Sequence, residues 1–590
     1  MSKQDSKETT QTINANGVKL RVREWSKDKS PTIVLVHGYP DSSHVWDKTC
    51  AILAKKYHVA VYDVRGAGES DAPKHTKAYA LEHLAADFRA VIDHISPDKP
   101  IHLVAHDWGS IQSWESVTDP KLADRIASFT TISGPSLDHA GYWIAQRLKS
   151  GKPDEIGKVA GQLAHSWYIG AFHLPVLAPS LWKSGLDKLW PTLLERVEGV
   201  VEAEPSKTQR ADGATGINLY RANFRERILA PQEKRTDVPV QLVVPTKDNY
   251  VSTELFEDLH QWAPKLWRFD VNAGHWLQVS KPAMVARYIN DFVDFIEAGG
   301  DEAKAPPVLR RARIAGPRKP YSGKLVIVTG AGSGIGRETL LGFAEQGAEV
   351  VGVDINEETL ARTIELAELL GVPAHGRKLD VGDKRAWERF ATWVDKNLGA
   401  PDVVVNNAGI GVAGRFLDTE AEDWDKILKV NVWSVIHGSR LFGKQMLAAG
   451  KSGHIVNVAS AAAFTPARFF SAYATTKAAV RMLSDCMRAD LAEDGIHVVT
   501  VCPGVINTGI TDRTQFTGMS EDEQSQKRAR ASKIYARRNL GPKAVAKGIL
   551  KAVDSDKDEV LIGAEAYGMN LLGRFAPGLA RRLAQFDLTA

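Results

Sequence analysis

The residues with the clearest capacity for chemistry lie in the segment His106-Asp107-Trp108-Gly109. An apolar run before it predicts a buried strand, and a helical pattern follows it. Small residues at Ala105 and Gly109 permit a strained turn between strand and helix, which leaves the Asp107 side chain exposed above the sheet. A carboxylate suits attack at a saturated carbon, which gives an alkyl-enzyme ester. We therefore predict that Asp107 is a nucleophile.

Length and composition limit the classes of protein to consider. The chain has 590 residues, which predicts more than one domain, and a net charge of +4, which is far from a nucleic-acid-binding protein. The first residues are polar and no run of apolar residues is long enough to span a membrane. The cysteines are three in number and widely spaced, and no metal-ligand spacing occurs. These observations predict a cytoplasmic protein without disulfides, metal or nucleic-acid partner.

The strand and helix pattern breaks near the middle of the chain. Glycine pairs, proline pairs and the cluster Arg310-Arg311-Ala312-Arg313 interrupt it. We predict an α/β domain over residues 14–298, a linker over 299–320 and a second α/β domain over 321–590. The arginine cluster is interpreted as solvated linker charge, and binding of an anionic partner is the alternative.

Further motifs accompany this strand–turn–helix segment, which we call the nucleophile elbow: His37-Gly38-Tyr39-Pro40, Asp63-x-Arg65-Gly66-x-Gly68-x-Ser70 and Gly274-His275-Trp276. In this order, and over roughly residues 14–298, the set resembles the α/β-hydrolase epoxide hydrolases. The resemblance implies an α/β-hydrolase fold in which Asp248 orients the base His275. It also implies that the backbone N–H groups of Tyr39 and Trp108 face the carboxylate oxygen that becomes an oxyanion during ester hydrolysis.

Residues 135–236 lose the alternating pattern and are helical and rich in aromatic side chains. The segment resembles the helical cap over the active site of epoxide hydrolases. Two of its tyrosines, Tyr168 and Tyr220, lie in stretches that resemble those carrying the proton donors for the opened epoxide. Packing of the cap core is the alternative role for both. The aromatic content favours a bulky apolar substrate.

The predicted reaction starts with attack of Asp107 on an oxirane carbon while Tyr168 and Tyr220 protonate the oxygen. His275 then activates a water molecule, and hydrolysis of the ester releases a vicinal diol. A haloalkane dehalogenase also uses an aspartate nucleophile, and Trp108 would suit halide binding. Tyr39 stands where such enzymes often have an asparagine as second halide donor, which favours the epoxide.

The second domain begins with a buried strand, a glycine-rich turn at 330–336 and a helix, the pattern that places a pyrophosphate at a helix N-terminus. The next strand ends at Asp354. This carboxylate can accept hydrogen bonds from the adenosine ribose and would repel a 2′-phosphate. NAD is therefore favoured over NADP, although Arg337 is a nearby basic group.

The remaining motifs, Asn406-Asn407-Ala408-Gly409 and Tyr473-x-x-x-Lys477 among them, resemble a short-chain dehydrogenase/reductase with a Rossmann fold. Tyr473 and Lys477 share one helix face, where the ammonium stabilises the phenolate of a general acid/base. The resemblance implies that Ser460 holds the substrate oxygen and Asn431 binds a water linked to Lys477. It implies a cofactor site formed by Gly330, Ser333, Gly334, Ile335, Gly336, Asp354, Asp380, Val381, Asn407, Ala408, Gly409, Tyr473, Lys477, Pro503, Gly504 and Thr508.

Two segments of the second domain suggest further contacts. Residues 508–538 are polar and charged, which indicates a mobile substrate lid. Residues 566–590 are amphipathic, with leucines, phenylalanines and arginines. We interpret this tail as packing on its own domain or on a second copy, and contact with a membrane surface or lipid substrate is the alternative. The family resemblance also implies a homo-oligomer through the second domain.

Taken together, the motifs predict a bifunctional enzyme, an epoxide hydrolase fused to an NAD-dependent dehydrogenase. Such a fusion resembles a mycobacterial or actinobacterial type of epoxide hydrolase, which favours lipid epoxides. The vicinal diol is a secondary alcohol of the kind that the second domain oxidises, so we hypothesise sequential use that gives a hydroxyketone. A binding role for one half is the non-enzymatic alternative, but each set of catalytic residues is present.

Overall fold

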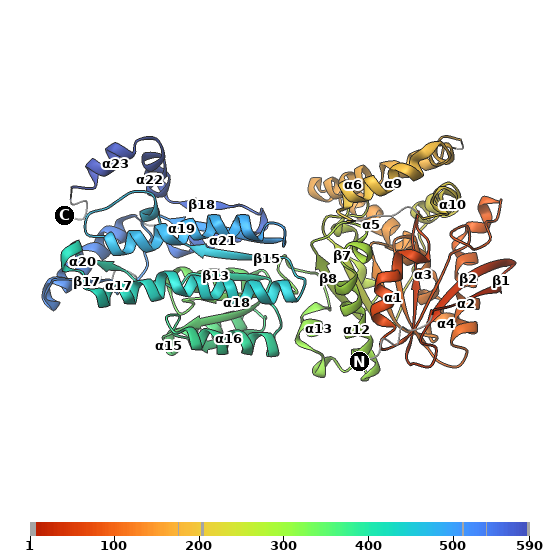
Figure 1. Cartoon of the computed structure of the whole chain (residues 1–590), viewed down its shortest axis with the longest axis horizontal. Helices are drawn as coiled ribbons and strands as arrows, with labels where there is room; N and C mark the ends of the chain where they lie inside the picture. The colour runs from red at the N-terminus through yellow and green to blue at the C-terminus, as the bar shows by residue number, and fades with distance from the viewer. Residues whose placement is uncertain (1–7, 175, 202–205, 510–512, 539, 587–590) are drawn as a thin grey trace. The chain divides into compact units, whose positions relative to one another are not determined.

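A computed structural model describes residues 8–174, 176–201, 206–509, 513–538 and 540–586. The chain forms two compact units, residues 1–318 and 319–590, each built on its own sheet (Figure 1). Both units are α/β, as the sequence predicts. Among the described residues, no helix combines the length and apolar character needed to cross a bilayer.

The first unit has a sheet that is antiparallel at its edges and parallel in its centre. Its strands, in spatial order, are β1 (Thr9–Ala15), β2 (Val18–Trp25), β4 (His58–Tyr62), β3 (Thr32–Val36), β5 (Ile101–His106), β6 (Ile126–Ile132), β7 (Val240–Pro245), β8 (Leu266–Val271) and β9 (Arg313–Ile314). The central strands are apolar on both faces because helices cover both. One face packs on α1 (Asp47–Leu53) and α12 (Pro282–Glu297), the other on α2 (Leu81–Ile95) and α3 (Trp108–Thr118).

The cap lies in the chain between β6 and β7. Its helices are α5 (Leu137–Ser150), α6 (Pro153–His165), α7 (Trp167–Phe172), α8 (Leu177–Leu181), α9 (Asp187–Glu198) and α10 (Gln209–Leu229). Figure 1 shows α6, α9 and α10 gathered on one side of the unit. Side chains of α7, α8 and α10 join the same apolar cluster as the central strands, so the cap continues the core of the hydrolase.

Part of the segment predicted as a linker belongs to the first unit. Residues 307–312 form the helix α13 (Pro307–Ala312), and β9 pairs with β8 through Ile314 and Leu266. Leu309 and Ile314 are buried, which gives this proline- and arginine-rich stretch an apolar anchor. The boundary between the units falls after Arg318.

The second unit is a parallel sheet wound in both directions from its first strand. The strand order is β12 (Ala374–Lys378), β11 (Glu349–Asp354), β10 (Leu325–Thr329), β13 (Val403–Asn406), β15 (Gly453–Val458), β16 (Ile496–Pro503) and β18 (Glu559–Ile562). One face packs on α14 (Gly334–Glu345), α15 (Glu357–Glu368) and α21 (Pro542–Asp554), the other on α16 (Lys384–Asn397), α18 (Ser434–Ala448) and α19 (Ser471–Leu491). The order reverses between β10 and β13, where such sheets bind ligands.

The predicted lid contains regular structure. It holds β17 (Gln515–Phe516), which pairs with β14 (Val412–Ala413), and the helix α20 (Glu521–Arg538), while residues 510–512 lie outside the described part of the chain. The amphipathic tail forms α22 (Ala564–Phe575) and α23 (Pro577–Leu583), and residues 587–590 are not described. Its exposed apolar side chains are Tyr567, Leu571, Phe575, Leu579, Leu583 and Phe586.

Candidate active sites

Asp107 stands at the turn between β5 and α3 with a φ of 50° and a ψ of −123°. Three glycines allow this turn to sit tightly against its neighbours. A Cβ on Gly38 would lie 2.6 Å from the Asp107 Cβ, one on Gly109 would lie 2.4 Å from the Val36 carbonyl oxygen, and one on Gly134 would lie 2.3 Å from the Asp107 carbonyl oxygen. The carboxylate is buried at the carboxyl end of the parallel strands.

The two oxygens of the Asp107 carboxylate face different groups. Oδ2 accepts a hydrogen bond from the backbone N–H of Tyr39 at 2.8 Å. Oδ1 lies 3.8 Å from Nε2 of His275. Burial raises the pKa of Asp107, and the charge of His275 with the N–H groups of Tyr39 and Trp108 opposes that rise. The two carboxylate oxygens are therefore held differently, Oδ2 by a backbone N–H and Oδ1 beside the imidazole.

Asp248 and His275 form a buried pair beside the nucleophile. Nδ1 of His275 lies 2.9 Å from Asp248 Oδ2, and Asp248 Oδ1 accepts the N–H groups of Tyr250 and Val251. Burial alone would lower the pKa of His275, but the charges of Asp248 and Asp107 outweigh it and raise the pKa to about 9. The imidazole is thus oriented with Nε2 toward the nucleophile.

Tyr168 and Tyr220 come from α7 and α10 and meet over the same site, with ring centroids 6.0 Å apart. The Tyr220 ring lies edge-on to Trp108, the neighbour of the nucleophile, at 4.8 Å. Burial raises the pKa of both phenols, so both remain proton donors. A third tyrosine, Tyr250, packs edge-on to Tyr168 at 5.5 Å and to His275 at 5.0 Å. Tyr250 belongs to no motif in the sequence. Its backbone is held by Asp248, whose Oδ1 accepts the Tyr250 N–H.

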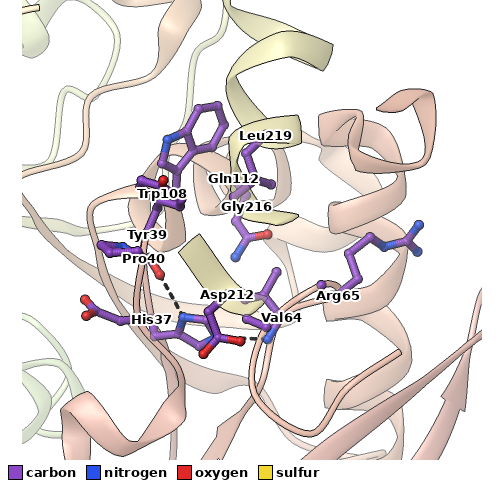
Figure 2. A pocket seen from close by; sticks show the side chains of 14 residues that line it. His37, Tyr39, Pro40, Val64, Arg65, Trp108, Gln112, Asp212, Gly216 and Leu219 are labelled. Carbon is purple, nitrogen blue, oxygen red and sulfur yellow. Dashed lines mark hydrogen bonds between the residues drawn. The ribbon is translucent and has the colours of Figure 1, made fainter. Parts of the chain in front are cut away.

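The loop that carries Tyr39 is held from both sides. His37 is buried; its Nε2 accepts the N–H of Val64 at 2.9 Å, and its Nδ1 lies 2.9 Å from the Gly38 carbonyl oxygen (Figure 2). Burial lowers the pKa of His37, which keeps the ring neutral in this structural role. On the cap side, the Tyr39 hydroxyl donates to the Gly213 carbonyl oxygen at 2.9 Å and accepts from Trp182 Nε1 at 2.8 Å.

A small pocket of about 20 Å³ lies beside this loop. Figure 2 shows Gln112, Trp108 and Asp212 on its wall, with α10 passing above. Gln112 Oε1 is buried and has no hydrogen-bond partner among the described residues. The volume matches one water molecule, which could donate to Gln112.

The second unit has a cavity of about 840 Å³ at the point where its strand order reverses. The glycine-rich turn forms one wall. A Cβ on Gly336 would lie 2.1 Å from the Gly330 carbonyl oxygen, so the turn requires glycine there. The predicted residues Ser333, Asp380, Val381, Asn407, Ala408, Gly409, Pro503, Gly504 and Thr508 all line the cavity. The cradle and its volume fit a dinucleotide.

Asp354, predicted to contact the adenosine ribose, lines this cavity. Its Oδ2 accepts the N–H of Gly332 at 2.8 Å, and its Oδ1 accepts the N–H of Asn356 at 3.0 Å. Arg337 donates to Thr363 Oγ1 at 3.0 Å and to the carbonyl oxygen of Gly332, the residue whose N–H Asp354 accepts. Arg513, which the sequence analysis did not single out, reaches the glycine-rich turn from the lid and donates to Ser333 Oγ at 2.9 Å.

The residues predicted to be catalytic in the second unit, Ser460, Tyr473 and Lys477, also line this cavity. Lys477 Nζ donates to the Val458 carbonyl oxygen at 2.9 Å and lies 5.8 Å from the centroid of the Tyr473 ring. Burial lowers the pKa of Lys477 to about 8. Ser460 begins the turn after β15 and also lines the cavity.

Asn431 lies in a widened helical turn, where its Oδ1 accepts the N–H of Ile410 at 2.9 Å and its Nδ2 donates to the Ile410 carbonyl oxygen at 3.0 Å. The amide is thereby fixed close to Lys477, because a Cβ on Gly409 would lie 3.3 Å from Asn431 Oδ1 and 3.5 Å from Lys477 Nζ. Asn431 and Lys477 therefore lie beside the same glycine, which fits the predicted water link between them.

Family models match both units and confirm the hydrolase fold and the Rossmann fold expected from the sequence. The model of the alpha/beta hydrolase fold matches residues 31–282, and the model of the short chain dehydrogenases matches residues 324–517. The chain is an enzyme that combines a hydrolase-fold domain with an oxidoreductase domain, and its second unit uses a nicotinamide cofactor.

The chain belongs to the family of Probable oxidoreductase EphD of Mycobacterium tuberculosis (strain ATCC 25618 / H37Rv), to which it is 40% identical over 580 residues, 97% of each chain. Putative oxidoreductase SadH of the same strain is 32% identical over 267 residues, 45% of this chain and 94% of that protein. A solved short-chain dehydrogenase/reductase from Burkholderia phymatum in complex with NAD is 28% identical, with a TM-score of 0.40, and covers 42% of this chain and 92% of that one.

Proposed function

We propose that the first unit hydrolyses an epoxide to a vicinal diol through an ester of Asp107. The observation that carries the proposal is a carboxylate at the nucleophile elbow with two protonated phenols above it. Oδ1 of Asp107 attacks one oxirane carbon, the C–O bond breaks, and Tyr168 or Tyr220 transfers its proton to the departing oxygen. A serine or cysteine elbow would favour acyl transfer instead.

The ester is then hydrolysed by water activated by His275. Alkylation removes the charge of Asp107, one of the anions that raise the pKa of His275, so the imidazole loses its proton more readily once the ester has formed. The hydroxide attacks the ester carbonyl, and negative charge collects on Oδ2, which the Tyr39 N–H already contacts. As this intermediate collapses, the bond from the ester carbon to the diol oxygen breaks, and that oxygen takes the proton that His275 removed from water. The new carboxylic acid loses its proton, which restores the Asp107 carboxylate and, through solvent, the phenol that served as donor.

Diol formation tests the proposal. Wild type, Asp107→Ala and the pair Tyr168→Phe and Tyr220→Phe are incubated with lipid and aryl epoxides, and diol is measured by mass spectrometry. Wild type should form diol, Asp107→Ala should form none, and each phenylalanine variant should lose roughly 10- to 100-fold in rate with one proton donor removed. Halide release from haloalkanes, without diol from any epoxide, would instead indicate a dehalogenase.

For the second unit we propose NAD-dependent oxidation of a secondary alcohol, with Tyr473 as the base that takes the hydroxyl proton and Ser460 as the group that holds the oxygen. The cofactor supplies the two-electron acceptor. Asp354 supports NAD over NADP because a 2′-phosphate beside its carboxylate would meet a like charge, and the guanidinium of Arg337 already donates to Gly332 and Thr363. The ratio of kcat/KM for NAD and NADP should favour NAD and should fall in Asp354→Ser. An unchanged ratio would contradict this role for Asp354.

We further propose that the two reactions act in sequence on a hydrophobic or lipid epoxide in the cytoplasm, with the second unit forming a homo-oligomer. The aromatic side chains of the cap support an apolar substrate, and the exposed apolar face of α22 and α23 supports either contact between copies or contact with a lipid surface. A hydroxyketone formed from the epoxide and NAD, lost in both Asp107→Ala and Tyr473→Phe, would support the sequence. Accumulation of diol with NAD present would contradict it for that substrate.

A further inference from the structure

Glu198 is a buried carboxylate at the end of the cap helix α9. It is 7% exposed, whereas Glu195, one turn earlier on the same helix, is exposed. Its Oε2 accepts the backbone N–H of His275 at 2.6 Å, and its Oε1 accepts Nδ2 of Asn249 at 3.1 Å. A carboxylate taken from water needs such partners, and here they belong to the loops that carry the acid and base of the hydrolase site.

The base loop is shaped for this carboxylate. A Cβ on Gly274 would lie 2.4 Å from Oε2 of Glu198, so only glycine leaves room for the hydrogen bond. Helix α9 ends directly after Glu198, because Gly199 adopts a left-handed conformation with a φ of 65°. The contact is therefore built from both sides, by the end of a cap helix and by the glycine before His275.

Three hydrogen bonds from other side chains hold His275, besides the backbone N–H of Leu277 that its carbonyl oxygen accepts. Asp248 holds Nδ1, and Nε2 of His106 donates to the His275 carbonyl oxygen at 2.9 Å. Gln278 donates to Nδ1 of His106, which makes Nε2 the protonated nitrogen of that ring. These contacts come from the core of the hydrolase, while the third, from Glu198, comes from the cap.

We propose that Glu198 is a positioning residue for the base His275, one that ties the backbone of the base to the cap and places a negative charge beside the imidazole. This inference rests on the epoxide hydrolysis proposed above. The cap would then do more than supply Tyr168 and Tyr220, since its position would also set the geometry of the base.

The titratable groups around His275 determine how much the charge of Glu198 changes the pKa of the imidazole. Asp107, Asp248 and Glu198 all raise the pKa of His275. Asp41 is a further carboxyl near the ring; burial raises its pKa to about 7, and the charge of His275 opposes that rise. His106 contacts the imidazole edge-on at 4.7 Å, and Tyr250 does so at 5.0 Å. Once Asp107 is an ester, Asp248 and Glu198 are the two groups of the first set that still raise the pKa of His275. Loss of the Glu198 charge should therefore lower the pKa of His275 in the ester and shift the acid limb of ester hydrolysis to lower pH.

The experiment separates charge from position. Wild type, Glu198→Gln and Glu198→Ala are alkylated in a single turnover, and the decay of the alkyl-enzyme is followed by quenched mass spectrometry at several pH values. In Glu198→Gln the acid limb should move to lower pH, because the amide still accepts the His275 N–H but carries no charge. In Glu198→Ala the plateau rate should also fall roughly 10- to 100-fold, because that N–H loses its acceptor. The control Glu195→Gln should match wild type.

A double-mutant cycle tests the contact itself. Gly274→Ala should slow ester hydrolysis strongly in wild type and much less in Glu198→Ala, where the clash with Oε2 is gone. An acid limb of Glu198→Gln identical to that of wild type, or additive effects in the cycle, would overturn the inference. The His275 titration by NMR in the resting protein keeps the two proposals apart. If wild type forms no alkyl-enzyme, epoxide hydrolysis is wrong, and the presence or absence of a lowered His275 pKa in Glu198→Gln then decides the role of Glu198.

Discussion

Asp107 holds a backbone conformation that glycine adopts more readily than any side chain with a Cβ. The turn is held there by strand β5 on one side and helix α3 on the other, and the close approach of Gly38, Gly109 and Gly134 leaves no space for it to relax. Strain of this kind costs on the order of 1–3 kcal/mol. In return, the carboxylate reaches the oxyanion hole and His275 at the same time.

This strain gives an unusual order of stability between two inactive variants. Asp107→Gly and Asp107→Ala both remove the carboxylate, but only glycine relieves the backbone. We expect Asp107→Gly to have a free energy of unfolding about 1 kcal/mol or more above that of Asp107→Ala, the reverse of the usual effect of glycine. Urea denaturation of the two variants measures the difference. Equal stabilities would mean that the elbow stores no strain.

His275 should couple stability to pH in a defined direction. Its pKa in the folded protein is about 9, above the ordinary value of 6.5, so protonation favours the folded state. This contribution is complete below about pH 6.5 and disappears as the pH rises through about 9. The stability advantage of wild type over His275→Gln should therefore shrink between these values, by at most about 1.4 kcal/mol per pH unit. Urea denaturation at pH 6, 8 and 10 checks this, and an advantage that grows with pH would contradict it.

At the scale of elements, helix α10 presents glycines where the cap meets the core. A Cβ on Gly213 would lie 2.2 Å from the Trp182 ring, and one on Gly216 would lie 2.5 Å from the Tyr39 ring. These positions allow α10 to approach the oxyanion loop closely enough for the Gly213 carbonyl oxygen to accept the Tyr39 hydroxyl. Glycine lowers the intrinsic stability of a helix, and the close contact with the oxyanion loop compensates for that loss in α10.

Alanine should therefore act in opposite directions on two cap helices. Gly216→Ala should destabilise the first unit by about 1–3 kcal/mol and slow ester hydrolysis, because Tyr39 has to move. Gly161→Ala in α6 meets no atom within 4 Å and should stabilise the unit by about 0.5–1 kcal/mol. Thermal unfolding and diol formation compare both variants with wild type. A stabilised and fully active Gly216→Ala would disprove the tight contact.

The sequence predicted the parts of the site that depend on local structure. Asp107 and Asp354 follow apolar strands, and Tyr473 and Lys477 share a helix face, so short segments specify their placement. Glu198 could not be found in this way. Its partner His275 is distant in the chain, and nothing in the sequence of α9 distinguishes Glu198 from its exposed neighbour Glu195. The sequence signal was the glycine of Gly274-His275-Trp276. The structure shows why a glycine is needed there, because a Cβ on Gly274 would clash with Glu198 of the cap.

At the scale of the whole molecule, the residues proposed for each reaction all lie within one of the two units. The boundary was harder to predict, because the segment with prolines and arginines looked like a solvated linker. Its anchors are single apolar residues such as Leu309 and Ile314, and β9 is only two residues long. A strand this short carries no periodicity that a sequence pattern could reveal.

Since each proposed site is formed by the residues of one unit, the two reactions should be separable between chains. A mixture of Asp107→Ala and Tyr473→Phe proteins should convert epoxide to hydroxyketone, because diol released by one variant can diffuse to the other. Ketone formed by the mixture and by wild type is compared at equal concentration of active sites, with each variant alone as the control. If only wild type forms ketone, the diol passes between the units of one chain without release.

Tyr39 belongs to two parts of the enzyme at once: its N–H contacts the nucleophile and its hydroxyl is bonded to the cap. An enzyme whose specificity and turnover depended on unconnected residues could change one without the other. Here a cap remodelled to admit a larger substrate would also displace the group that stabilises the second chemical step. Directed evolution toward bulky epoxides should thus yield variants that bind the substrate and become alkylated but hydrolyse the ester slowly. A second substitution that restores the contacts of Tyr39 should recover the rate of ester hydrolysis.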